Sequence, residues 1–253
     1  MIDIYDLYQD FEAAYNTFQG GFFPPQSVFL RAVNNINQDL WIRWTREAEK
    51  SQEAKDNLFP FLKSENVICQ QQPSYYSVVA PPKDYGRLST ANILVTKDNK
   101  TVPKKEVNGG KCCNGEFKQD EDLSKDYYDN VSEKTVEIID NKRWASCLEH
   151  LTKNPTFDKP KMTQINNGFK VAPREVSVIV LNYYKLPEDA TFAYTTVGGN
   201  LATGSGGQII YNKAASNPLL WNTSMKPEFL IELGVRFSLY TREQFIFATT
   251  QKK

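Results

Sequence analysis

The sequence predicts an α+β fold, because segments with a helical pattern come first, strand-like segments follow, and one more helical segment lies near the end. Strands and helices do not alternate along the chain, so the pattern does not fit the parallel sheet of an α/β protein. At 253 residues, the chain is long enough for one large domain or two small ones with a sizeable core.

The N-terminal region has the apolar spacing of two helices, separated by a Gly-Gly-Phe-Phe-Pro-Pro turn. The first helix is predicted over residues 2–18 and the second over Gln26–Leu62. A helix of about 30 residues would be about 45 Å long, and its polar stretch 45–57 is expected to project from the body. The apolar stripe of the second helix consists of Phe29, Val33, Ile36, Leu40 and Trp44.

Residues 67–221 are predicted to form a β-rich body, arranged like a sandwich or a barrel. The polar, glycine- and lysine-rich stretch 97–122 is expected to be an insertion loop on its surface. Residues 136–139 allow a further strand, and Trp144 to Leu151 has the spacing of a short helix. The clearer strand-like segments are 67–69, 75–79, 89–96, 162–165 and 175–184.

Two more strands, Thr191–Val197 and Gln208–Tyr211, flank a glycine-rich stretch and predict a β-hairpin arm over 191–211. Pro227 opens a final amphipathic helix, which a short aromatic tail follows. The expected divisions, which together form one folded unit, are 1–66, 67–221 and 222–253.

The charge balance argues against nucleic-acid binding as the main function. Lys plus Arg and Asp plus Glu each number 30, so the formal net charge is zero, whereas counterion release requires a basic face. The cysteines, with Cys112 next to Cys113, lack the spacing of a zinc site. No apolar run is long enough to span a membrane, and the N-terminus lacks the pattern of a signal peptide. The sequence therefore predicts a soluble protein without a metal or a cofactor.

No set of residues has the pattern of a catalytic site. The glycine-rich stretch has the spacing of a phosphate-binding loop, but a Ser-Gly pair stands where Lys-Ser/Thr is required, and a strand follows. The single histidine, His150, lies three residues from Cys147, and a structural role at a helix end is favoured over a catalytic pair. Tyrosine pairs such as Tyr75-Tyr76 suit strands and interfaces better than the stacking of bases or sugars. We therefore expect no enzymatic activity.

Several short motifs are spread along most of the chain, outside the insertion at 97–122. They are Gly20-Gly21-Phe22-Phe23-Pro24-Pro25, Pro81-Pro82-Lys83-Asp84-Tyr85, Pro155-Thr156 with Pro160, Val171-Ala172-Pro173, Tyr183-Tyr184-Lys185-Leu186-Pro187 and Leu220-Trp221. In this arrangement the chain resembles the head-to-tail connector and tail-barrel ring proteins of crAss-like phages that infect Bacteroidales. These motifs are architectural rather than catalytic.

The resemblance implies a non-enzymatic virion protein that is made in the cytoplasm of the bacterial host. Such proteins form homo-oligomeric rings, commonly twelvefold, that stack below the portal protein and against neighbouring ring or tail proteins. DNA passes through the lumen without sequence-specific contacts, and no membrane is involved. A ring contact joins two different faces of each subunit.

We expect the hairpin arm to reach a neighbouring subunit and the 45–57 segment to meet an adjoining ring. The alternative is a virion accessory module that binds a receptor or a carbohydrate through exposed tyrosines. The residues expected at the subunit interfaces are Gly198, Gly199, Asn200, Leu201, Thr203, Gly204, Gly207, Tyr194, Tyr211, Glu47, Lys50, Glu53, Phe245 and Phe247.

Overall fold

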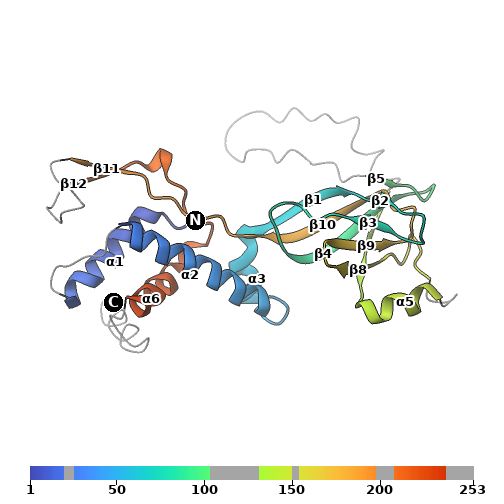
Figure 1. Ribbon diagram of the computed structural model, residues 1–253, viewed down its shortest axis with the longest axis horizontal. Helices are drawn as coiled ribbons and strands as arrows, with labels where there is room; N and C mark the ends of the chain where they lie inside the picture. Colours follow the sequence, from blue (N-terminus) through green and yellow to red (C-terminus); the bar gives the residue numbers. More distant parts are fainter. Residues whose placement is uncertain (20–25, 103–130, 150–153, 198–207, 238–253) are drawn as a thin grey trace. The chain divides into compact units, whose positions relative to one another are not determined.

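The chain forms two compact units with different secondary structure (Figure 1). The computed structural model describes residues 1–19, 26–102, 131–149, 154–197 and 208–237. One unit, here called the helical unit, combines Met1–Phe61 with Leu186–Lys253, and the other, the β unit, is the continuous segment Leu62–Lys185. The predicted α+β class is confirmed. The division expected after residue 221 falls inside the helical unit, because the hairpin and the last helix belong together there.

The helical unit contains two helices that end close to their predicted limits. The apolar spacing of the first segment produces α1, and Asp3 accepts a hydrogen bond from Tyr5 N (2.9 Å) in its first turn. Pro227 stands in the first turn of the last helix, as expected for a residue without an N–H group. The helices of this unit are α1 (Ile4–Gln19), α2 (Gln26–Glu47), α3 (Gln52–Leu58) and α6 (Lys226–Arg236), with 3-10 turns at Phe59–Phe61, Lys213–Ala215 and Thr223–Met225.

The prediction of a single long helix over Gln26–Leu62 is wrong. A short turn separates α2 from α3, and Ser51 caps α3 by accepting a hydrogen bond from Ala54 N (3.3 Å). A serine at this position satisfies an N–H group at a helix start, so it favours a new helix over continuation of the old one. Ala54 and Leu58 are fully buried. The segment 45–57 therefore packs one of its faces and is not a helix that projects into solvent.

Aromatic side chains from both ends of the chain fill the core of the helical unit. The ring of Phe11 in α1 lies 5.7 Å from that of Phe29 in α2 and 5.3 Å from that of Phe237, which follows α6. Trp221 lies 6.3 Å from Phe229 of α6, and both side chains are fully buried. The two chain segments therefore share one core.

Charged side chains fix α6 on α2. The guanidinium group of Arg43 pairs with Glu228 and Glu232, at 2.9 Å each. Arg236, at the end of α6, pairs with Asp39. Because residue numbers rise along one helix as they fall along the other, these pairs show that α2 and α6 run antiparallel.

The described residues of the β unit form two five-stranded sheets. The first sheet is entirely antiparallel, with the central order β1-β10-β4-β5, and β6 also pairs with β4. The second has the order β2-β3-β9-β8-β7, in which only β7 and β8 are parallel. The strands are β1 (Leu62–Ile68), β2 (Gln70–Gln71), β3 (Ser77–Val79), β4 (Tyr85–Thr96), β5 (Thr101–Val102), β6 (Val131–Thr135), β7 (Glu137–Ile138), β8 (Lys161–Ile165), β9 (Gly168–Ala172) and β10 (Val178–Lys185).

The two sheets share a mostly aliphatic core, so the β unit is a sandwich, one of the two arrangements predicted for its strands. Ile93 of β4 and Ile179 of β10 come from the first sheet, and Met162 of β8 and Val171 of β9 come from the second. All four side chains are fully buried. The predicted short helix after residue 140 is also confirmed as α5 (Asn141–Glu149), which lies beside β8 (Figure 1).

Strand β9 was not predicted, although its start has a strict requirement for glycine. Gly168 has φ +152°, and a Cβ atom added there would lie 2.2 Å from the carbonyl oxygen of Val79. This close approach lets β9 pair with β3 on one side and with β8 on the other. The Gly168 backbone thus helps to join the strands of the second sheet.

Candidate functional site

The strongest candidate site is a group of stacked aromatic rings at the base of the hairpin arm. The predicted hairpin is confirmed as β11 (Tyr194–Val197) and β12 (Gln208–Tyr211), which form an antiparallel two-stranded sheet. The rings of Tyr5 and Tyr211 stack at 4.7 Å and 7°. Phe192 lies 5.5 Å from Tyr211, 5.5 Å from Tyr194 and 5.3 Å from Tyr8. We call these five residues the aromatic base.

Asp3 holds the aromatic base from the N-terminal side. Its carboxylate accepts hydrogen bonds from Tyr211 Oη (3.3 Å) and from Tyr5 N (2.9 Å), and its second oxygen lies 3.5 Å from Lys213 Nζ. The backbone continues this link, because Ile2 and Leu219 form an antiparallel bridge. Residues from the two ends of the chain therefore fix the root of the hairpin.

Two tyrosines of the aromatic base are harder to ionise than an ordinary phenol. Burial, and then the charge of Glu12, raises the pKa of Tyr8 to about 12, although the hydrogen bond from Gln26 lowers it. Burial also raises the pKa of Tyr211, with the nearby charge of Asp3 acting in the same direction. A neutral phenol can pack and donate a hydrogen bond, so this site has the chemistry of a packing surface.

The hairpin has one packed face and one uncovered face. Tyr194 and Tyr211 are cross-strand partners, as are Thr195 and Ile210, so the two pairs point to opposite faces of the ribbon. The Tyr211 face packs on Tyr5 of α1. On the other face Ile210 keeps 49% of its surface exposed. The uncovered face is therefore available for a contact outside this chain.

The predicted interface residues fall into three groups. Tyr194 and Tyr211 lie together in the aromatic base, where Tyr211 is half-buried. Glu47, Lys50 and Glu53 are exposed around the turn between α2 and α3. The residues that lie outside the described part of the chain are Gly198, Gly199, Asn200, Leu201, Thr203, Gly204, Gly207, Phe245 and Phe247.

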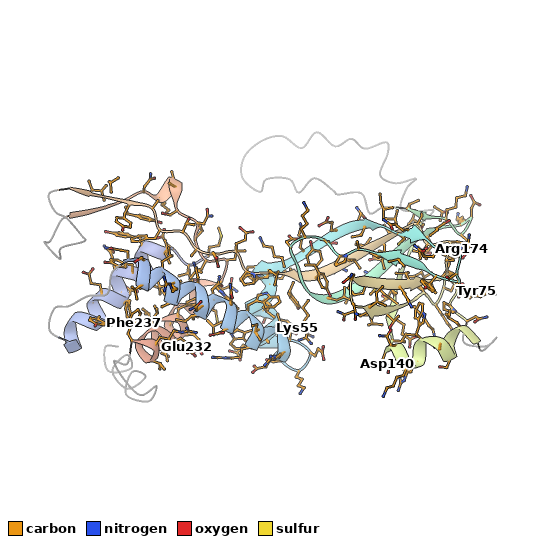
Figure 2. All side chains as sticks on the ribbon, viewed as in Figure 1. Lys55, Tyr75, Asp140, Arg174, Glu232 and Phe237 are labelled. Atoms are coloured by element: carbon orange, nitrogen blue, oxygen red, sulfur yellow. The ribbon has the colours of Figure 1, made fainter. Side chains whose placement is uncertain are left out.

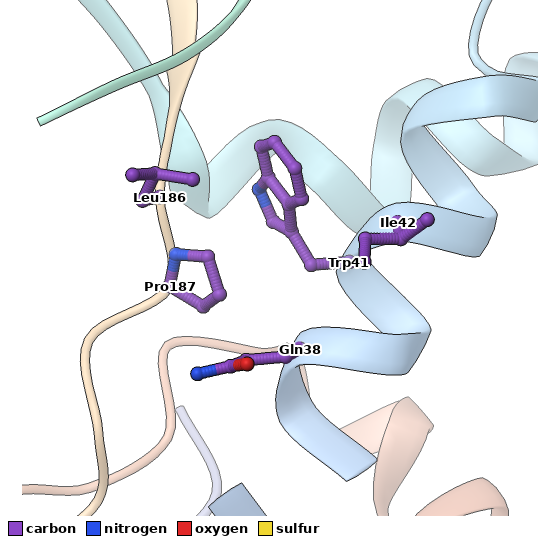
Figure 3. Close-up of a pocket in the computed structure, with 5 residues that line it drawn as sticks. All are labelled: Gln38, Trp41, Ile42, Leu186 and Pro187. Atoms are coloured by element: carbon purple, nitrogen blue, oxygen red, sulfur yellow. The ribbon is translucent and has the colours of Figure 1, made fainter. Parts of the chain in front are cut away.

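A second feature of the helical unit is a small apolar pocket beside α2 (Figure 3). It has a volume of about 270 Å³ and is lined by Gln38, Trp41, Ile42, Leu186 and Pro187. The indole nitrogen of Trp41 lies on the side of Leu186 and Pro187 (Figure 3), and it has no hydrogen-bond partner in the described part of the chain. The sequence does not indicate this pocket, because Trp41 has the pattern of an ordinary core residue. Its volume is below the range of common ligand pockets, so we assign it no ligand.

A polar network crosses the first sheet of the β unit. The hydroxyl of Tyr183, whose side chain is fully buried, lies 2.7 Å from Asp84 Oδ1 and 3.0 Å from Glu65 Oε2. Lys63 Nζ lies 3.0 Å from Asp84 and 3.1 Å from Glu65. Burial tends to raise the pKa of Asp84, but the hydrogen bonds from Tyr183 and Lys63 outweigh it and lower that pKa. Each charge is paired, so the network joins strands and does not resemble an acid–base catalytic pair.

The groups considered for metal or thiol chemistry do not assemble in the described residues. No three His, Cys, Asp or Glu side chains come close enough there to hold a metal ion. Cys69 is buried, and burial raises the pKa of its thiol to about 12, which leaves it protonated and unreactive at neutral pH. His150 and the Cys112-Cys113 pair lie outside the described residues.

The chain matches no protein-family model and no curated protein. No helix in the described ranges is long and apolar enough to cross a membrane.

Proposed function

We propose that this protein is a structural virion protein that forms a homo-oligomeric ring in the head-to-tail connector or tail barrel, below the portal. The observation that carries the proposal is the two-faced hairpin, which is anchored on α1 by Tyr211 and leaves Ile210 uncovered. An isolated two-stranded hairpin is at best marginally stable in water. A neighbouring copy that covers the Ile210 face would stabilise it.

A closed ring needs two different contact faces on each subunit. The uncovered face of the hairpin is one of them, and a different surface of the neighbouring copy would receive it. Stacking of one ring on another needs a separate contact. The exposed turn between α2 and α3, with Glu47, Lys50 and Glu53, is the proposed contact to an adjoining ring or to the portal protein. Charged side chains suit such a contact, because they give orientation and specificity at the rim of an interface.

Zero formal net charge supports a lumen through which DNA passes without being held. A strongly basic lumen would bind the phosphate backbone and slow passage. The resemblance in architectural motifs points to the same class of virion protein.

The experiment that tests this proposal measures assembly of the full chain and of three variants. Particle mass is measured by light scattering and shape by electron microscopy, both alone and after mixing with portal protein. We expect rings from the unchanged protein in at least one condition. Deletion of Gly199 to Gly206 should leave the monomer folded and abolish the rings.

Two matched substitutions separate the hairpin from general surface effects. Ile210→Glu places a charge on the uncovered hairpin face, and Ile138→Glu places one on an equally exposed strand of the β unit, where Ile138 is 51% exposed. We expect Ile210→Glu to reduce ring mass and Ile138→Glu to keep it. Rings from all variants would overturn the role of the arm. An unchanged protein that forms no ring in either condition and is missing from purified virions would overturn the function.

A further inference from the structure

We propose that a cleft at one end of the β unit binds an uncharged sugar ring. The cleft has a volume of about 520 Å³. It lies where the segment between β2 and β3, the segment between β9 and β10, and the chain after α5 come together, and Tyr75 and Arg174 both lie at this end of the unit (Figure 2). The residues that carry the argument are Tyr75, Asn154, Pro155, Pro173, Arg174 and Glu175.

The ring of Tyr75 faces solvent, while the adjacent Tyr76 is held in place by packing. Tyr75 is 83% exposed. The adjacent Tyr76 packs edge-on against Trp144 at 6.3 Å, and Lys170 Nζ lies 4.8 Å from the Tyr76 ring centre. An exposed aromatic ring beside a cleft offers an apolar face and a polar hydroxyl, which match the apolar face and the hydroxyl rim of a pyranose.

The Arg174 segment of the cleft lining is tied to the sheet. Ser77, which is fully buried, donates its hydroxyl to the carbonyl oxygen of Arg174 at 2.7 Å. Val176 N donates to the carbonyl oxygen of Pro173 at 3.2 Å. These bonds position the Arg174 segment before a ligand arrives, and preorganisation of this kind lowers the entropic cost of binding.

The polar groups of the cleft select a ligand that both donates and accepts hydrogen bonds. Arg174 offers donors and Glu175 offers acceptors, and neither forms an ion pair with another described side chain. Asn154 can donate its amide nitrogen to the carbonyl oxygens of Cys147 (3.2 Å) and Leu148 (2.9 Å) once its amide is turned to the orientation that satisfies both groups, and its oxygen is then left as an acceptor. Neighbouring hydroxyls of a sugar fit this mixture of donors and acceptors.

Charge argues against the other small ligands. The lining contains one guanidinium and one carboxylate, so a phosphate or carboxylate ligand would meet Glu175 and a cationic ligand would meet Arg174. An uncharged polyol avoids both repulsions. The volume falls in the usual range for a small ligand and suits one or two sugar rings. This binding would be independent of ring assembly, because every residue that forms the cleft lies in the β unit.

The test is a binding titration of the full-length protein with a panel of neutral monosaccharides and disaccharides, followed by ligand-observed NMR. A glucose 6-phosphate arm reports anion binding. We expect saturable binding of at least one neutral sugar at millimolar concentration or below. Tyr75→Ala should weaken it at least about tenfold, whereas Tyr75→Phe should keep most of it because the ring remains.

Two further variants and one control complete the test. Arg174→Ala and Glu175→Gln should each weaken binding, while Phe59→Ala, which removes a ring that is 71% exposed in the helical unit, should leave it unchanged. Ring mass is measured in parallel and should not change with Tyr75→Ala. The proposal is overturned if no neutral sugar binds, if only the phosphorylated sugar binds, or if Tyr75→Ala binds as the unchanged protein does.

Discussion

The helical unit and the β unit build their cores in different ways. In the helical unit, aromatic rings from sequence-distant segments pack together in the core among aliphatic side chains, as when Phe11 packs between Phe29 and Phe237. In the β unit one continuous segment supplies a mostly aliphatic core between two sheets, with Ile93 and Ile179 among its buried residues.

The two units therefore depend on the chain ends to different degrees. The helical unit requires residues before 62 and after 185 to meet, through contacts such as the Tyr5–Tyr211 stack and the Ile2–Leu219 bridge. The β unit contains both of its sheets within one segment. The β unit should therefore fold without the helical unit. The helical unit should not fold completely until the residues after 185 are present.

The largest effect should come from ending the chain at Lys185. This truncation removes α6, Trp221 and the hairpin, so the apolar faces of α1 and α2 lose their partners. We expect hydrogen exchange to show a protected β unit and an unprotected N-terminal segment. The isolated segment 62–185 serves as the control and should show the same protection. If the truncation also unfolds the β unit, the comparison between the two units is wrong.

Tyr183→Phe should produce the next largest effect, in the β unit alone. The variant removes the hydroxyl that lies 2.7 Å from Asp84 and 3.0 Å from Glu65. A hydrogen bond to a charged group contributes about 1.5–3 kcal/mol. Because the Asp84 and Glu65 side chains are 39% and 41% exposed, we expect a loss near the lower end of that range in the free energy of unfolding. Denaturant titration measures it. Tyr85→Phe is a control with a neutral partner, because the Tyr85 hydroxyl accepts from Leu88 N. An equal loss in both variants would contradict the special role of the charged acceptors.

A pair of tryptophan variants should sharpen the description of the helical unit. Trp221 donates its indole N–H to Asn37 Oδ1 at 2.7 Å, whereas the N–H of Trp41 has no partner in the described residues. Both Trp→Phe changes remove similar volume, but only Trp221→Phe leaves the buried Asn37 without a donor. We expect Trp221→Phe to cost about 1–3 kcal/mol more than Trp41→Phe in the free energy of unfolding. Equal costs would show that packing alone decides.

The smallest effect should come from Asp84→Asn, which should change the stability of the β unit only at acidic pH. The pKa of Asp84 is lowered in the folded state, so its contribution to stability is present above its unfolded pKa, near about pH 4, and is lost as the pH falls through the folded value. The side chain is 39% exposed, and solvent screening keeps this contribution modest. Asp84→Asn should therefore flatten the acid side of the stability profile of the β unit. A profile as steep as that of the unchanged protein would contradict this assignment.

Local patterns predicted the elements that have clear boundaries. Three such patterns each predicted their element: the apolar stripe of α1, the proline at the start of α6 and the apolar run in β10. The break between α2 and α3 was missed because the helical spacing continued through it, although Ser51 is a typical cap. Strand β9 was missed although Asn167-Gly168 is a typical hairpin signal next to its start.

The candidate sites depend on contacts that local patterns do not contain. The hairpin was predicted, with Tyr211 as an expected interface residue. The stack of Tyr211 on Tyr5 was not predicted, because it joins residues that are far apart in the sequence. The cleft beside Tyr75 needs the Arg174 segment to lie next to it, and only the pairing of β3 with β9 brings them together. The sequence shows that Tyr75 belongs to a tyrosine pair, but it does not show which of the two tyrosines faces solvent.

Because the helical unit is split between an early and a late part of the chain, its two parts are synthesised at different times. A ribosome adds about 5–20 residues per second, so the β unit can complete its sheets while the last part of the chain is still being made. During those seconds, α1 and α2 leave the ribosome without α6 and Trp221, and the surfaces around Phe11 and Phe29 are exposed to solvent. Newly made chains therefore pass through a period in which their N-terminal helices are open to chaperones and to premature contacts with other nascent copies.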